Sequence, residues 1–457
     1  MTVARRPDQP VATEPLTTKP LATEPRPTEP RTTDPETLWH NPDFMKFWSG
    51  EALSLFGTQV TNLALPLTAV MIFNASPQQV GLLRFLQLVP YLFLALVFGV
   101  WVDRSRRKPI MLLANVSRMV LIALVPVLSH FHALSITGLL VIACVVGIFS
   151  VLFDVSWMSF VPALVRDAKH YIEANQKLGV TQSTTDVAGP GMAGVLVGWL
   201  TAPTALVVDA ASYLASLASL LWIRTPEPAP PPPAGNRHLG RELADGVRWV
   251  FGDRILRPLA LVAPFTNFSL TCVWTLFLLY GVRDKGLSPA TVGLIFSASS
   301  VGGLVGAIIS KALIRRFRIG VLYGASLSGI FAGPLLIPLA NGSRPMLIAT
   351  FILSFLITYL GLGVAGVVMI SLRQTCTPQS LMGRMTAAFR TLLFGGGALG
   401  GLSAGLIGGA MGLRAGLTLV AVCSAGMLVP IALSPVVRLR AMPPPALEPV
   451  KHSPTST

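Results

Sequence analysis

Twelve long apolar stretches dominate this sequence and restrict what it can fold into. Each is about 20 residues or longer, the length that a helix needs to cross the hydrocarbon core of a bilayer. Because no water reaches that core, a spanning segment must satisfy its own backbone hydrogen bonds, and a helix does so. With soft edges, the stretches are 48–73, 79–101, 110–129, 134–160, 178–200, 204–224, 255–280, 291–313, 320–341, 346–370, 388–411 and 414–437. The sequence therefore predicts an all-α membrane protein with twelve transmembrane helices.

The composition argues against a soluble globular protein of this size. Of the 457 residues, 52% are hydrophobic and only 12% are charged, whereas ~25% are charged in ordinary soluble domains. Too few polar side chains remain to cover a water-exposed surface. The four cysteines and six histidines show no spacing typical of a disulfide framework or a metal site. We therefore expect neither a metal nor a cofactor.

The two ends of the chain are predicted to be disordered tails outside the bilayer. Residues 1–47 carry a five-residue repeat that places proline at positions 15, 20, 25, 30 and 35. A polar, proline-rich segment of this kind cannot bury a core and favours an extended chain. We interpret it as a tether or spacer, with a partner-binding arm as the alternative. Residues 438–457 have the same character.

A polar linker at 225–254 divides the spans into six and six. It begins with a proline-rich run and continues with a helical pattern, which is predicted to lie on the membrane surface rather than cross it. The apolar face of that helix consists of Leu239, Leu243, Val247, Val250 and Phe251. The linker separates an N-terminal six-helix bundle, 48–224, from a C-terminal six-helix bundle, 255–437.

The two halves repeat each other. Ser76-Pro-Gln-Gln-Val-Gly-Leu-Leu83 opens the second span, and Ser288-Pro-Ala-Thr-Val-Gly-Leu-Ile295 opens the eighth. Spans five and eleven also align, with Gly194 at the position of Gly401. Halves that repeat in the same orientation predict two pseudo-symmetric bundles, related by an axis along the membrane normal, with a binding site between them.

Lysine and arginine are distributed unevenly between the two sides. The predicted outer loops hold only Arg283, Lys285, Arg344 and Arg414. Two more arginines lie within spans, and the remaining 29 of the 35 basic residues fall on the other side. Because Lys and Arg accumulate on the cytoplasmic side, both termini are predicted to be cytoplasmic in a multi-pass protein of the cell membrane. The same distribution explains the net charge of +15 without a nucleic-acid partner.

The loop Gly99-Val-Trp-Val-Asp-Arg-Ser-Arg-Arg-Lys108 resembles the signature between spans two and three of the major facilitator superfamily. With the twelve spans and their division into six and six, the resemblance covers residues 44–440. Four further stretches of the chain resemble the branch of this superfamily that contains the enterobactin exporter and macrolide-efflux proteins. These are Phe153–Val165, Gly189–Gly194, Ser371–Pro378 and Gly383-Arg384. The resemblance implies alternating access, in which the two bundles rock about a central site.

The same loop is predicted to gate the cytoplasmic side. Asp103 and Arg107 are four residues apart, so they can pair across one helical turn, and Asp154 lies at the same depth. The resemblance implies that this cluster, with Gly99 and Arg104, latches the outward-facing state and breaks when the cytoplasmic side opens. Solvated charges that only fix the topology are the alternative.

The fifth span contains Gly189, Pro190 and Gly194, which resemble part of a motif of drug/proton antiporters and favour export. Pro190 removes a backbone hydrogen bond and kinks the helix. The glycines permit close helix contact, which we expect to be made with Gly302 and Gly306 of the eighth span. Span eleven carries a longer glycine series: Gly397, Gly401, Gly405 and Gly409. A surface on which the bundles rock and a static packing surface are both compatible with this pattern.

Charged residues inside the predicted spans need a partner or a water-filled cavity. Asp186 lies about 12 Å into its span at the α-helical rise, close to the midplane. It is the first candidate for proton coupling, and Glu51, nearer the cytoplasmic end, is the second. An ion pair of Asp186 with Arg118 is the alternative. Asp209 is interpreted as structural, with Arg84 as a candidate partner.

Polar and amphipathic residues are candidates for lining the substrate cavity, which the resemblance places among spans one, four, seven and ten. They are Gln59, Asn62, Asn267, Trp274 and Tyr359. Hydrogen bonds to a neighbouring helix are the alternative role for the amides. The remaining wall is apolar, which suits a bulky and partly hydrophobic organic molecule.

Together these features predict a secondary active transporter that works as a monomer. It would export a hydrophobic or amphipathic small organic molecule, such as a drug, antibiotic, siderophore or secondary metabolite, in exchange for protons. An uncoupled or importing facilitator is the alternative within transport. A polytopic membrane enzyme is a further alternative, but no loop carries clustered His, Asp or Glu, and the phosphate-binding loop of an ATP-driven pump is absent.

Overall fold

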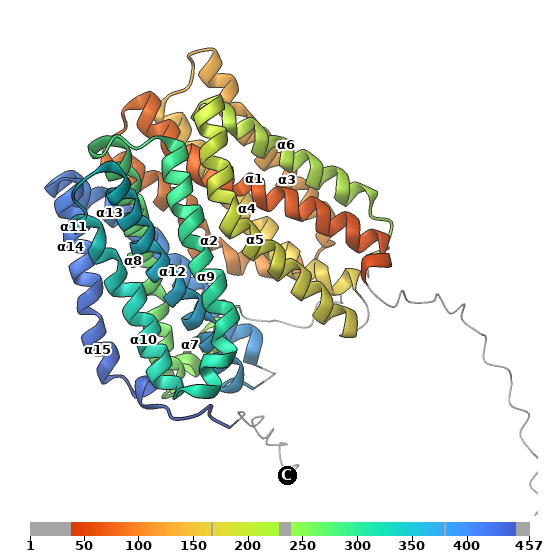
Figure 1. The fold of residues 1–457 in the computed structure, drawn as a ribbon. Coiled ribbons are helices and arrows are strands. Elements are labelled where there is room, and N and C mark those ends of the chain that lie inside the picture. The colour runs from red at the N-terminus through yellow and green to blue at the C-terminus, as the bar shows by residue number, and fades with distance from the viewer. Residues whose placement is uncertain (1–37, 166–167, 228–238, 379–380, 445–457) are drawn as a thin grey trace, which may run out of the picture.

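A computed structural model describes residues 38–165, 168–227, 239–378 and 381–444. These residues form helices joined by short turns and contain no β-strand. Figure 1 shows two groups of helices side by side, which we call the N-terminal bundle (α1–α6) and the C-terminal bundle (α8–α15). The all-α prediction is therefore confirmed for the part of the chain that the structure describes.

The helices follow the predicted order closely. The N-terminal bundle consists of α1 (Pro42–Phe73), α2 (Pro77–Asp103), α3 (Arg107–His130), α4 (Ile136–Leu164), α5 (Ala168–Leu200) and α6 (Ala202–Trp222). After α7 (Leu239–Gly252), the C-terminal bundle consists of α8 (Leu256–Leu279), α9 (Pro289–Arg316), α10 (Ile319–Ala332), α11 (Leu336–Leu339), α12 (Arg344–Thr375), α13 (Met382–Met411), α14 (Leu413–Gly426) and α15 (Leu428–Leu433). A π-helical turn extends α8 to Asp284, and a 3-10 turn joins α10 to α11.

Ten helical segments among the described residues are long and apolar enough to cross a membrane. The predicted count of twelve is therefore not confirmed, although the helical fold agrees. Of the helices at predicted spans, α2 and α5 are outside this group. For α5 the physical reason is a run of six polar residues, Thr181–Asp186, which lowers its hydropathy.

The repeated Ser-Pro-x-x-Val-Gly segments make equivalent contacts between the bundles. A Cβ atom added to Gly81 on α2 would lie 2.6 Å from the Cα of Gly405 on α13. In the other half, a Cβ atom added to Gly293 on α9 would lie 2.7 Å from the Cα of Gly194 on α5. Distances this short permit no side chain, so α2 packs directly on α13 and α9 packs directly on α5.

The expected partners of the α5 glycines were only partly right. The eighth predicted span, α9, does face α5, but through Gly293 rather than through Gly302 and Gly306. A Cβ atom at Gly302 would meet the carbonyl oxygen of Leu356, and one at Gly306 would meet that of Leu360, both on α12. Because these two glycines lie on another face of α9, they serve packing inside the C-terminal bundle.

Described structure extends into both segments that the sequence predicts to be tails. Helix α1 begins at Pro42 rather than at 48. Asn41 caps this start, because its side chain accepts hydrogen bonds from the N–H groups of Asp43 and Phe44. Phe44 is fully buried, so apolar burial orders this part of the predicted tail. At the other end, the N–H of Gly320 donates to the carbonyl of Leu439. Residues 1–37 and 445–457 lie outside the described residues.

The linker helix α7 packs against α13 and α8 of the C-terminal bundle. Val250 is fully buried there, and Trp249 and Phe251 pack around the same core. Gly246 lies so close to α13 that an added Cβ atom would be 2.7 Å from the Arg384 carbonyl oxygen. Val247, predicted to be on the apolar face, is exposed, while the side chains of Leu239 and Leu243 lie outside the described part of the structure.

Substitution of Gly293 by alanine is expected to destabilise the protein. The added methyl group overlaps the α5 backbone, and such overpacking costs about 1–3 kcal/mol. The matched control is Gly366→Ala on α12, where an added Cβ atom meets nothing within 4 Å and where alanine favours the helix by about 0.5–1 kcal/mol. Thermal unfolding of detergent-purified protein should show a lower midpoint for the first variant and an equal or higher one for the second. An equal change in the thermal midpoint of both variants would contradict the close contact between α9 and α5 at Gly293.

Candidate functional site

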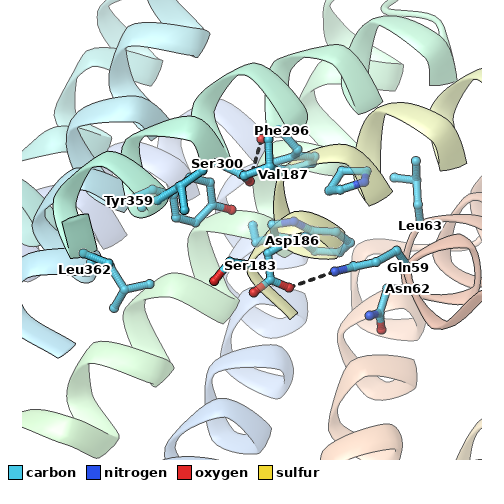
Figure 2. A pocket seen from close by; sticks show the side chains of 16 residues that line it. Gln59, Asn62, Leu63, Ser183, Asp186, Val187, Phe296, Ser300, Tyr359 and Leu362 are labelled. Carbon is cyan, nitrogen blue, oxygen red and sulfur yellow. Dashed lines mark hydrogen bonds between the residues drawn. The ribbon is translucent and has the colours of Figure 1, made fainter. Parts of the chain in front are cut away.

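A cavity of about 380 Å³ lies between the two bundles. Helices α1 and α5 form one wall, and α8, α9 and α12 form the other (Figure 2). Its lining residues are Gln59, Asn62, Leu63, Ser183, Asp186, Val187, Pro190, Trp274, Phe296, Ser300, Gly303, Leu304, Ala307, Tyr359, Leu362 and Gly363. A site that both bundles line changes shape whenever one bundle moves relative to the other.

Asp186 is the charged residue among these lining residues. Its Oδ1 atom accepts hydrogen bonds from the Nε2 of Gln59 at 3.1 Å and from the Nε2 of Gln182 at 2.9 Å. Gln182 is one turn earlier on the same helix, whereas Gln59 reaches Asp186 from α1. The Asp186 side chain is exposed to the cavity. Figure 2 shows the Tyr359 ring pointing toward it from the C-terminal bundle.

Aromatic side chains stiffen the opposite wall. The rings of Trp274 and Phe296 stack with their centroids 5.3 Å apart, and Phe355 stacks with Tyr359 at 6.1 Å. Phe277 packs edge-on against both Phe296 and Phe355 behind this wall. Such ring clusters supply a large and rigid apolar surface with a few polar atoms at its edge.

A second cavity of about 250 Å³ adjoins the first and shares Trp274 and Tyr359 with it. Its remaining lining residues are Arg84, Leu88, Asn267, Leu270, Thr271, Phe355 and Phe394. The guanidinium carbon of Arg84 lies 4.2 Å from the centroid of the Trp274 ring. Asn267 donates from Nδ2 to the Leu393 carbonyl at 2.7 Å, so part of its amide also holds α8 to α13.

The structure places all five candidate cavity residues in the walls of these two cavities. The set of helices that line the cavities differs from the expected set. Helices α5 and α9 take part in the wall, and none of the described lining residues belongs to α4. Helix α5 enters the wall through its polar stretch, whereas α4 packs mainly against α2 and α3.

The arrangement of two helical bundles around a central cavity agrees with comparison to known proteins. A family model described as Major Facilitator Superfamily matches residues 47–401. The chain belongs to this superfamily. It is therefore a multi-pass membrane transporter by family, which points away from an enzymatic activity.

Two curated relatives of this superfamily member are exporters. The multidrug efflux pump Tap of Mycolicibacterium fortuitum is 25% identical over 378 residues, covering 79% of this chain and 87% of the relative. The enterobactin exporter EntS of Escherichia coli is 27% identical over 421 residues, covering 88% and 95%. A solved bacterial homologue of the human lysosomal transporter Spinster, inward-facing and unoccupied, has a TM-score of 0.66 at 18% identity and covers 87% of this chain and 97% of that chain. At that identity the likeness shows the fold alone.

The charged residues within the N-terminal bundle have partners other than those expected. Arg118 donates to Asn115 and lies between two aromatic rings, 4.1 Å from Phe153 and 4.5 Å from Tyr213. The alternative role considered for Asp186, an ion pair with Arg118, is not observed, because Asp186 accepts hydrogen bonds from the two glutamines. Rings and a side-chain amide make the close contacts of this buried cation, and the carboxylates of Glu51, Asp154 and Asp209 lie within electrostatic range of it.

Asp209 is fully buried on α6 and accepts hydrogen bonds from the hydroxyl groups of Thr61 and Ser212. Arg84 lies over the Trp274 ring rather than beside Asp209, so the candidate pair of these two residues is not formed. Glu51 is also buried, and its Oε2 has no hydrogen-bond partner. Hydroxyl groups from α1 and from α6 itself supply hydrogen bonds to the Asp209 carboxylate.

The residues of the expected latch have separate partners in this conformation. Arg107 contacts Glu227 of the linker, with its backbone N–H 2.6 Å from one carboxylate oxygen. A Cβ atom added to Gly99 would meet nothing within 4 Å, so no described helix packs closely against this glycine. Arg104 follows the last residue of α2 and is exposed. The side chain of Asp103 lies outside the described part of the structure.

Asp154 takes part in a contact between the bundles that sequence reasoning missed. It lies 3.3 Å from the Nη2 of Arg390 on α13 and accepts a hydrogen bond from the Tyr91 hydroxyl at 2.9 Å. Tyr91 in turn stacks on Phe394 at 4.1 Å. The predicted span 388–411 has Arg390 at its edge, but α13 begins at Met382, about two turns before Arg390. The early start of that helix is what brings Arg390 opposite α4.

The Asp154–Arg390 pair is expected to couple the two bundles energetically. Both side chains are partly exposed, so the pair should contribute about 0.5–1 kcal/mol. Asp154→Asn and Arg390→Gln should each lower the thermal midpoint of the purified protein. The midpoint of the double variant should be no lower than that of the less stable single variant. Asp154→Asn combined with Arg344→Gln, an exposed arginine elsewhere, should give additive shifts. Additivity for both combinations would contradict the coupling.

Proposed function

We propose that this superfamily transporter exports an amphipathic small organic molecule from the cell in exchange for protons. The observation that carries the proposal is the cavity between the bundles, in which one carboxylate faces largely apolar and aromatic walls. Its volume of about 380 Å³ falls within the ~300–1,000 Å³ usual for sites that hold drug-sized ligands. The exporter names of the two curated relatives support the direction of transport.

The chemical nature of the walls supports a partly hydrophobic substrate. Trp274, Phe296 and Tyr359 offer ring faces, while Gln59 and Asn62 offer amides on the facing side. A few polar groups set in an apolar wall orient a ligand, and burial of its apolar body supplies most of the affinity. A sugar would leave most of its hydroxyl groups without partners in such a cavity.

Asp186 is the residue that we propose to carry the proton. Its carboxylate faces the cavity, and both of its described hydrogen bonds come from neutral amides. Protonation therefore removes the cavity's charge without breaking an ion pair, and a substrate can respond to that change directly. Glu51 is the second candidate, because one of its oxygens is buried without a partner. It lies within electrostatic range of Arg118.

Alternating access would use the glycine contacts described above. We propose that the Gly81–Gly405 and Gly194–Gly293 contacts close the outer side, and that Pro190 lets α5 bend as the bundles rock. Both termini would be cytoplasmic in the cell membrane, and one chain would suffice for transport. In the opposite conformation, Gly99, Asp103, Arg104, Arg107 and Asp154 would come together as the cytoplasmic latch.

Asp186→Asn should abolish transport driven by a pH gradient and leave substrate binding measurable, because the amide keeps the shape of the side chain but exchanges no proton. The measurement is accumulation of tetramethylrhodamine in inverted membrane vesicles under an imposed pH gradient, with the membrane potential clamped at zero. Asp284→Asn, an exposed carboxylate outside the cavity, serves as the control and should transport normally. Unchanged gradient-driven accumulation in Asp186→Asn would exclude Asp186 as the coupling site.

Asp103→Asn should shift the protein toward the conformation open on the side of its basic loops, because it removes the latch carboxylate. The readout is the rate at which a membrane-impermeant thiol reagent labels Ala307→Cys in the cavity wall. Cys144 and Cys423, which are not fully buried, are first replaced by serine. Labelling from the cytoplasmic side should rise several-fold, and Asp284→Asn should leave it unchanged. A rate equal to that of the parent would argue against the latch.

A further inference from the structure

Arg84 is a half-buried cation for which the described residues supply no carboxylate. It lies on α2, about 10 Å inside the start of that helix at the α-helical rise, and forms part of the wall of the 250 Å³ cavity. Its Nη1 donates to Gln87 at 3.0 Å, and its Nε is buried without an acceptor. A guanidinium has five N–H donors, so most of its capacity is unused.

No ion pair joins Arg84 to an acidic side chain of the described residues, and three aspartates inside the N-terminal bundle contact other groups. Asp186 accepts from two glutamines, Asp209 accepts from two hydroxyl groups, and Asp154 pairs with Arg390. None of the described residues lining the 250 Å³ cavity is acidic. A charge at this depth needs a counter-charge or a polar cavity, and Trp274 supplies only the face of a ring.

We infer that Arg84 binds an acidic group of the transported molecule and that the 250 Å³ cavity is the subsite for that group. This inference rests on the proposed function. Arginine matches carboxylates geometrically, because two parallel N–H groups can meet both oxygens. Stacking on Trp274 fixes the plane of the guanidinium, so its donors are oriented before the ligand arrives.

The position of Arg84 relative to Asp186 defines what kind of molecule would fit. Trp274 and Tyr359 line both cavities, so an aromatic or alicyclic body can lie against these rings. One end of such a body then faces Arg84 and the other faces Asp186. The subsite therefore selects organic acids or zwitterions over molecules that carry only a positive charge.

The local packing of α2 supports a binding role. A Cβ atom added to Gly401 would lie 2.8 Å from the Cβ of Arg84, so the absence of a side chain at 401 lets the arginine stem pass across the bundle interface. Its head group then reaches Trp274 on α8. Because Arg84 belongs to one bundle and Trp274 to the other, an anion bound there contacts both halves of the transporter.

The test compares two forms of one dye that differ in a single carboxylate. Tetramethylrhodamine carries that group, and its methyl ester does not, while the cationic ring system is the same. Binding to the purified full-length protein in lipid nanodiscs is followed by fluorescence anisotropy, with empty nanodiscs as the blank. The wild type should bind the free acid more tightly than the ester.

Arg84→Gln should weaken binding of the free acid by about tenfold or more, as expected for loss of a charge-assisted hydrogen bond. The same variant should change the Kd of the ester by less than about twofold. Arg84→Lys keeps the charge and should retain part of the preference for the acid, which guards against a folding defect in the glutamine variant. Arg344→Gln, which removes an exposed arginine away from both cavities, should behave as the wild type.

Equal loss of both dye forms in Arg84→Gln would show that Arg84 only holds the bundles together, and would overturn the inference. So would a wild-type protein that binds both forms equally or binds neither. The proposed function is judged separately by vesicle transport. If a pH gradient drives transport of the ester and the free acid equally well, the proposed export function stands and the acidic subsite is rejected. If the protein binds the free acid more tightly than the ester but transports neither, only the proposed export function is rejected.

Discussion

Direct backbone contact between two pairs of helices is the constraint on which the rest of this structure depends. Helix α2 meets α13 at Gly81 and Gly405, and α9 meets α5 at Gly293 and Gly194. No side chain separates these helices, so the bundles are held at a short distance near the start of α2 and of α9. The 380 Å³ cavity lies further along α5 and α9, and the 250 Å³ cavity lies further along α2 and α13. Both cavities therefore lie beside helices that the glycine contacts hold together.

The sequence repeat predicts the fold well because it encodes this pseudo-symmetric contact. The two Ser-Pro-x-x-Val-Gly segments open helices that take equivalent places, and the glycine of each segment is the residue in contact. Helix positions followed from hydropathy, and the walls contain Gln59, Asn62, Asn267, Trp274 and Tyr359. Hydropathy was less informative for α5, since a helix that lines a polar cavity does not need to be apolar throughout.

The pairing of charges could not be predicted in the same way. Depth along a helix follows from counting residues, but the direction in which a side chain points depends on helix rotation and on its neighbours. Arg118 and Asp186 have similar depths, yet one packs between aromatic rings and the other faces the cavity. Arg390 pairs with Asp154 only because α13 starts earlier than its hydropathy indicates. Such contacts are tertiary, and short-range sequence patterns carry little information about them.

The distribution of charge within the cavities is the feature that links packing to transport. Asp186 belongs to the N-terminal bundle and faces rings of the C-terminal bundle, and Arg84 stacks across the same boundary on Trp274. When the bundles rock, the distance between each charge and the opposite wall must change, because charge and ring move with different bodies. A ligand or proton that alters either charge therefore has a different binding free energy in the two conformations. That difference is the condition for coupling binding to a conformational change.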